Sequence, residues 1–224
     1  MKKTFSDGFS LIELAIVLII ISFLMGFLLI PISAKKDQQY LKSTQKTLEE
    51  IKDALLGFAV RNGRLPCANR NDNDGTESKN ADESACESNG EGYLPWLVLG
   101  VGKDDVWGNP FRYRTEAAFN QMTGIEPTNI DSGLRVRNRL DDIDWTTAAG
   151  DSRVVAIIFS YGKNYQADDD NANLSKKTFV HDGSVYMPNL PIDDPNNFDD
   201  ILTWLSRNTL MNRLTTAKRW PPDP

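Results

Sequence analysis

The chain has 224 residues, 40% of them hydrophobic and 25% charged, and a formal net charge of -6. This length suits one domain plus an appendage, and the composition excludes a wholly disordered chain and a polytopic membrane protein. The acidic balance disfavours a nucleic-acid-binding surface, and 1 His with 2 Cys leaves little material for zinc, haem or Cys–His catalytic sites.

Residues 9–34 form a largely apolar run in which Glu13 is the only charged residue. A run of roughly 25 residues is long enough to cross a bilayer as one helix and too long for a secretory signal peptide. The pair Lys2 and Lys3 precedes it, which predicts a cytoplasmic amino terminus and an extracytoplasmic remainder, although Lys35 and Lys36 on the far side weaken that orientation. A carboxylate inside such a run must be neutral, be paired or reach the interface. Glu13 either extends toward the headgroups or pairs within an assembly.

The stretch Gly8-Phe9-Ser10-Leu11-Ile12-Glu13 closely resembles the cleavage and methylation signal of type IV pilins and type II secretion pseudopilins. The resemblance implies that a prepilin peptidase cuts after Gly8 and methylates the new terminus at Phe9. It also implies that Glu13 attracts the terminal ammonium of a neighbouring subunit during filament assembly. The expected partners are the prepilin peptidase, other pilin or pseudopilin subunits, an inner-membrane assembly platform and, before assembly, membrane lipid.

After residue 34 the helical pattern continues, with apolar residues spaced by three, four and seven. These residues are Leu41, Leu48, Ile51, Leu55 and Phe58. The pattern predicts an amphipathic helix that packs on a globular body and ends at Gly63 and Pro66. A surface helix of any anchored protein would show the same pattern, but direct fusion to the apolar run favours the long spine of pilins.

Cys67 and Cys86 flank a polar loop, and their number, spacing and expected compartment predict a disulfide. Within this loop residues 72–77 look like a calcium loop, but the register fails and favours a solvated acidic turn. Asp168, Asp169 and Asp170 follow a segment similar to the one before the calcium site of major pseudopilins. They are candidate calcium ligands, and no other cofactor is expected.

The rest of the chain predicts short strands followed by a helix. Turn residues and aromatics indicate a strand from residue 111, and apolar runs predict strands at 133–136, 153–160, 177–180 and 184–187. The apolar spacing over 199–214 predicts a second helix. No second His and no Cys lies near His181 in the sequence, which disfavours a metal or general-base role.

The predicted fold class is therefore α+β and pilin-like. A long N-terminal helix, transmembrane and then amphipathic, would pack on an antiparallel sheet head with a C-terminal helix. Residues 1–8 would be a leader, 9–34 the membrane or filament-core helix, and 35–224 the head. The expected location is the bacterial inner membrane, as a single-pass protein with a periplasmic head, and later a pilus or pseudopilus.

The predicted function is that of a structural subunit, a minor pilin of a type IV pilus-like filament, with a type II secretion pseudopilin as the close alternative. An anchored enzyme is a different class, but no nucleophile with a base or set of metal ligands is apparent, so no catalytic residue is expected. An adhesion or DNA-uptake receptor is the other alternative. Net acidity argues against nucleic acid, although Arg135, Arg137 and Arg139 along one strand keep that option open.

Overall fold

The computed structural model describes residues 10–87, 91–126, 132–139, 143–146, 153–172, 177–182 and 198–220, and at residues 26–35, 91, 169 and 170 it describes the backbone alone. The chain divides into two units, Met1–Tyr40 and Leu41–Pro224. Each unit is considered by itself below.

Helix α1 runs from Leu11 to Asn62 and contributes to both units. In the first unit its apolar side chains at residues 11–25 are all exposed, by 44% at Ile21 to 87% at Leu11. The helix ends where Gly63 takes a positive φ of 70°, and the Gly63 N–H donates to the Ala59 carbonyl at 2.8 Å. Glycine adopts this left-handed cap without steric cost, which explains the stop.

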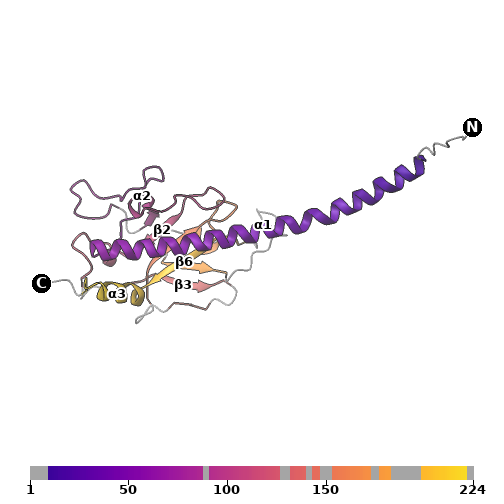
Figure 1. The fold of residues 1–224 in the computed structure, drawn as a ribbon. Coiled ribbons are helices and arrows are strands. Elements are labelled where there is room, and N and C mark those ends of the chain that lie inside the picture. The colour runs from indigo at the N-terminus through magenta and orange to yellow at the C-terminus, as the bar shows by residue number, and fades with distance from the viewer. Residues whose placement is uncertain are drawn as a thin grey trace, which may run out of the picture. The chain divides into compact units, whose positions relative to one another are not determined.

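The second unit is built on a four-stranded antiparallel sheet in the order β1-β2-β4-β6. Its strands are β1 (Glu91–Tyr93), β2 (Arg112–Thr115), β4 (Val154–Ser160) and β6 (Ile201–Ser206). Figure 1 shows the later part of α1 lying over this sheet. There the α1 residues Leu48, Ile51 and Leu55 are fully or almost fully buried. They share one cluster with Phe111, which precedes β2, and with Tyr113 of β2.

A second, two-stranded sheet pairs β3 (Arg135–Asn138) with β5 (Thr178–His181) in parallel. It encloses a smaller core that contains Val136, Phe179 and three residues of β4. Every residue of β4 is buried, because one face of the strand packs in the α1 cluster and the other in this smaller core. This double burial explains why β4 reads as a continuous apolar run instead of alternating with polar residues.

The remaining elements are short. They are α2 (Trp96–Leu99), η1 (Ala117–Phe119), η2 (Asp169–Ala172) and α3 (Arg207–Thr216). Ser206 caps the start of α3, where its hydroxyl accepts a hydrogen bond from the Thr209 N–H at 3.2 Å. Its buried residues Leu210 and Leu214 join the α1 cluster.

The structure contradicts the predicted fold class and location. Within the described residues, no helix has both the length and the apolar character needed to span a membrane. The predicted spine with a transmembrane first half, and the single-pass inner-membrane location that depended on it, are therefore wrong.

The head also differs from the prediction in two elements. Residues 201–206 are strand β6 and only the following residues form a helix, so the predicted helix over 199–214 is wrong in its first half. The predicted strands at 133–136 and 177–180 overlap β3 and β5, but these pair in parallel and apart from the main sheet. The predicted strand at 184–187 lies outside the described residues.

Candidate functional site

The loop after α1 is closed by the predicted disulfide. Cys67 and Cys86 are bonded, with 5.4 Å between their Cα atoms and a sequence separation of 19. This confirms the pairing expected from the two cysteines. In the chain-entropy model, a cross-link closing a loop of this size stabilises the fold by about 3 kcal/mol.

A buried ion pair holds the start of this loop. The Arg64 guanidinium donates to both carboxylate oxygens of Glu77, at 2.6 and 3.1 Å, and each side chain is only 9% exposed. The Cys67 N–H donates to the same carboxylate at 2.8 Å. Burial raises the pKa of Glu77, but the bonds from Arg64 and Cys67 outweigh it, so the pKa lies below its ordinary value. The carboxylate is therefore charged at neutral pH.

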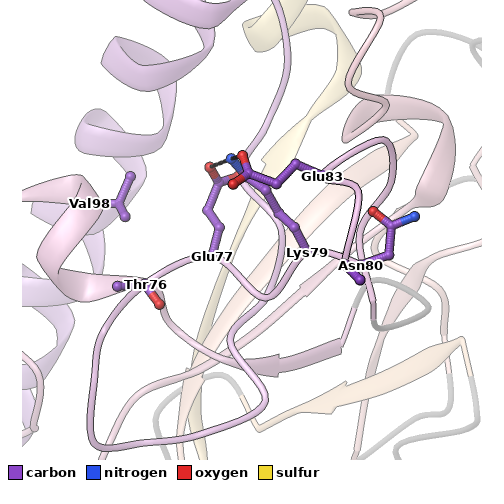
Figure 2. A pocket seen from close by; sticks show the side chains of 7 residues that line it. Thr76, Glu77, Lys79, Asn80, Glu83 and Val98 are labelled. Atoms are coloured by element: carbon purple, nitrogen blue, oxygen red, sulfur yellow. Dashed lines mark ion pairs between the residues drawn. The ribbon is translucent and has the colours of Figure 1, made fainter.

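Beside this pair the loop forms a hollow of about 380 Å³. In Figure 2, Glu77, Lys79 and Glu83 converge at its wall, where the Lys79 ammonium lies 3.7 Å from Glu77 and 3.5 Å from Glu83. The three charged groups pair with one another, so none of Glu77, Lys79 and Glu83 is left unpaired to bind a ligand or take part in a reaction. In the predicted acidic turn, Asp74 accepts hydrogen bonds from Asn69 and Thr76, as expected of a turn held by its own side chains.

A different acidic cluster lies where η2 approaches the start of β6. Asp168, Asp199 and Asp200 each place a carboxylate oxygen within 4.8 Å of the others. Asp199 is 5% exposed and Asp200 is 7% exposed. This "aspartate cluster" is the only group of three or more potential metal-ligating side chains found within the described ranges.

Backbone groups fix one oxygen of each carboxylate. Asp199 Oδ2 accepts from the N–H groups of Lys163 and Asn164, at 2.7 and 3.0 Å. Asp200 Oδ2 accepts from the Asp168 N–H at 2.9 Å, and Asp168 Oδ2 accepts from the Asp199 N–H at 2.7 Å. The three side chains thus have defined positions before any ligand is present.

The second oxygens of the two most buried members have no partner. Asp199 Oδ1 and Asp200 Oδ1 are buried without a hydrogen bond, and no Lys or Arg in the described parts of the chain forms an ion pair with any of the three carboxylates. A buried carboxylate oxygen without a partner is unfavourable. The arrangement therefore suits a group that brings positive charge.

The electrostatics reflect this crowding. Burial raises the pKa of Asp199 to about 7, and the charge of Asp168 adds to the rise, against the hydrogen bonds from Asn164 and Lys163. Burial also raises the pKa of Asp200 well above its ordinary value, with further contributions from Asp168 and Asp199. Either a proton or a cation would relieve the repulsion.

The cluster overlaps the predicted calcium ligands in one residue. Asp168 belongs to it, whereas the backbone of Asp169 and Asp170 lies in η2 and their side chains are outside the described atoms. Sequence reasoning missed Asp199 and Asp200 because it assigned them to a helix. The available signal was a pair of adjacent carboxylates immediately before an apolar strand.

At the amino-terminal end, Glu13 lies in the first turn of α1. Its Oε2 accepts a hydrogen bond from the Ser10 N–H at 3.1 Å, and its Oε1 has no hydrogen bond within the described part of the chain. The carboxylate thus caps the helix start, where it also interacts favourably with the helix dipole. Gly8 and Phe9, the predicted processing and assembly residues, lie outside the described residues.

The other candidate side chains are engaged within the head. Arg135 is paired with Asp144 at 3.5 Å and Arg139 with Asp182 at 3.2 Å. His181 packs against the rings of Trp145 and Trp204, with centroid distances of 4.8 and 6.0 Å. Burial lowers the pKa of His181, against the charge of Asp182, so the ring is neutral at pH 7.

No protein-family model, curated protein or solved structure matches this chain.

Proposed function

We propose that this protein is a structural subunit of a filament, in which residues 11–25 of α1 are buried among the same residues of neighbouring copies. The observation that carries the proposal is the all-round exposure of large apolar side chains along that segment. A helix that is apolar on every face needs apolar cover on every face.

The energetic gain from such burial is large. Covering the exposed part of each side chain contributes about 1 kcal/mol, or on the order of 10 kcal/mol for the segment. Other copies of the same helix offer suitable cover, because the apolar segment is equally long in every copy. A minor subunit of a type IV pilus-like filament and a type II secretion pseudopilin both use this arrangement.

Glu13 would fix how neighbouring subunits align along the helix axis. Cleavage after Gly8 would create an ammonium at Phe9, and one oxygen of Glu13 is left without a partner by the Ser10 hydrogen bond. A carboxylate and an ammonium buried between apolar helices each need the opposite charge, so a subunit displaced by one turn leaves both unpaired.

Two substitutions distinguish pairing from simple helix capping. Glu13→Gln keeps an acceptor for the Ser10 N–H but removes the charge, and Glu13→Ala removes both. We expect both variants to be processed and folded but absent from sheared filaments, while the control Lys46→Gln, on an exposed part of the same helix, assembles normally. Normal assembly of Glu13→Gln would refute the charge-pairing role.

Processing itself is tested by intact mass. The protein from a host that expresses a prepilin peptidase should lack residues 1–8 and carry one additional methyl group. An uncut chain would contradict the proposed assembly route.

A second property is favoured by the aspartate cluster: the head binds a divalent cation, with calcium the best fit. Calcium takes six to eight oxygen ligands and prefers carboxylates and carbonyls. Asp168, Asp199 and Asp200 would hold it, with the partnerless Oδ1 atoms of Asp199 and Asp200 as the first ligands. Water and backbone carbonyls would complete the coordination.

Calorimetric titration of the full chain with CaCl₂ tests this site. We expect one site per chain, lost in Asp200→Asn and Asp199→Asn. Asp170→Asn tests the neighbouring predicted ligands, and Asp144→Asn is the control, since its exposed carboxylate pairs with Arg135 and is not a member of the cluster. Loss of binding in Asp170→Asn with retention in Asp200→Asn would refute the cluster as the site.

A further inference from the structure

A second hollow lies at the end of the head where α1 and α3 terminate. Its volume is about 310 Å³. This volume is at the lower end of the range for small-molecule sites. The lining residues are Arg61, Asn62, Gly63, Met122, Thr123, Gly124, Ile125, Lys218, Arg219 and Trp220. We call it the basic hollow.

Three cationic side chains line the basic hollow in a protein whose net charge is -6. Arg61, Lys218 and Arg219 form no ion pair with any residue that the structure describes. Basic residues commonly follow helix ends, where the dipole presents about half a negative charge. Two helix ends offset about one of the three positive charges, and the exposed Glu126 beside Ile125 offsets about one more. A positive charge of about one remains, and concave walls strengthen its field.

The backbone supports a role for Lys218 beyond ending a helix. Lys218 follows the last turn of α3 with a positive φ of 55°, and its N–H donates to the Thr215 carbonyl at 3.0 Å. At the ends of α1 and α2 the corresponding left-handed positions are occupied by Gly63 and Gly100, each with φ of 70°. Lysine is strained in this conformation, and strained residues persist where they serve a site.

The lining also contains apolar side chains, beside the polar Asn62 and Thr123. Ile125 is buried, while Met122 and the Trp220 indole are half-buried. A site lined by three cations together with an indole and aliphatic groups suits an anion that carries a compact carbon or phosphate body. A long polyanion such as nucleic acid would need an extended basic stripe instead.

We propose that the basic hollow binds a small anion bearing two or more phosphate or carboxylate groups. This site is independent of the filament contacts of α1 and of the aspartate cluster. Each ionic hydrogen bond from Arg61, Lys218 or Arg219 would be charge-assisted, and Arg can engage such groups with two donors.

Calorimetric titration of the full-length protein in metal-free buffer tests the proposal. Inorganic pyrophosphate and citrate are titrated separately, so that phosphate and carboxylate chemistry are distinguished. We expect one site for at least one of the two probes, with affinity that falls as salt rises. Arg61→Gln and Arg219→Gln should each weaken binding about tenfold. The control Arg213→Gln, on α3 but outside the lining, should leave it unchanged.

Lys218→Gly separates binding from folding. Glycine relieves the strain at this position, so the variant should unfold at a higher temperature while binding the anion about tenfold more weakly. A protein that merely tolerates Lys218 would gain stability with no change in affinity, which refutes its role. Absence of binding of both probes at millimolar concentration, or equal weakening by Arg213→Gln, overturns the site.

Discussion

Replacing Glu77 by Gln is expected to destabilise the head strongly. The carboxylate accepts bonds from both terminal nitrogens of Arg64 and from the Cys67 N–H. Glutamine retains one acceptor but leaves the Arg64 guanidinium, which is 9% exposed, without a counter-charge. Removing one partner of a buried pair costs about 3–5 kcal/mol. We expect a loss of about 3 kcal/mol, because the retained amide oxygen preserves part of the hydrogen bonding.

Thermal unfolding of the oxidised protein at pH 7, followed by circular dichroism, measures this loss. For a domain of this size, about 3 kcal/mol corresponds to a decrease in Tm of about 10 °C. The matched control is Glu83→Gln. The Glu83 side chain is 76% exposed and pairs with Lys79, which also lies near Glu77. Exposed pairs contribute about 0–1 kcal/mol, so the control should shift the Tm by no more than about 3 °C.

The pH dependence provides an independent check. The pKa of Glu77 is lowered in the folded state, so its contribution to stability is present above the unfolded value near 4.3 and is lost as pH falls through the folded pKa. The difference between wild type and Glu77→Gln should therefore shrink on acidification. Equal Tm values for the two Gln variants at pH 7, or a difference that grows toward pH 3, would refute the reasoning.

Three further perturbations follow from the same contacts. Cys67→Ser with Cys86→Ser should lower the free energy of unfolding by about 3 kcal/mol, measured by urea titration; no change would show that the loop needs no cross-link. In metal-free buffer the raised pKa of Asp199 means that folding favours its protonated form, so stability should fall as pH rises from about 4 to about 7, and Asp199→Asn should reduce that slope while the raised pKa of Asp200 maintains part of it. Gly162→Ala should destabilise the head by more than 1 kcal/mol, because Gly162 has φ of 64° and a Cβ would collide with the Asp199 backbone; a thermal melt equal to wild type would contradict this.

Local patterns predicted those parts of the head in which one signal dominates. The apolar residues Leu48, Ile51 and Leu55 recur at helical spacing, and all three are buried. The continuous apolar run of β4 indicated a central strand, and the two cysteines indicated the disulfide. In each case the deciding information lies within one short segment or in composition.

The missed features depend on contacts between distant segments. Ile201, Leu202 and Leu205 fit a helical period as well as a strand, and only pairing with β4 decides for the strand. The capping side chain of Ser206 was the local signal that the helix starts after it. The parallel pairing of β3 and β5 has no local signature, since the register of a parallel pair is set across the fold.

The sequence pointed to only one member of the aspartate cluster, Asp168, for the same reason. An acidic run at residues 168–170 stood out, but its structural partners are about 30 residues further along the chain. Hydrogen bonds such as that from the Asp199 N–H to Asp168 join the two segments. The membrane prediction combined the length of the apolar run with its flanking lysines, but within the described residues no helix has the length and apolar character that a membrane span needs.

The position of β6 has a consequence for how the head is made. Leu205, Leu210 and Leu214 complete the cluster that Leu48 and Ile51 begin, so residues more than 150 positions apart close one core. During synthesis the amphipathic face of α1 and the edge of β4 stay uncovered until β6 and α3 have emerged. Such distant contacts slow folding and leave intermediates whose exposed apolar surface makes them prone to aggregation. Residues up to Leu214 must therefore be available before the head can cover this core.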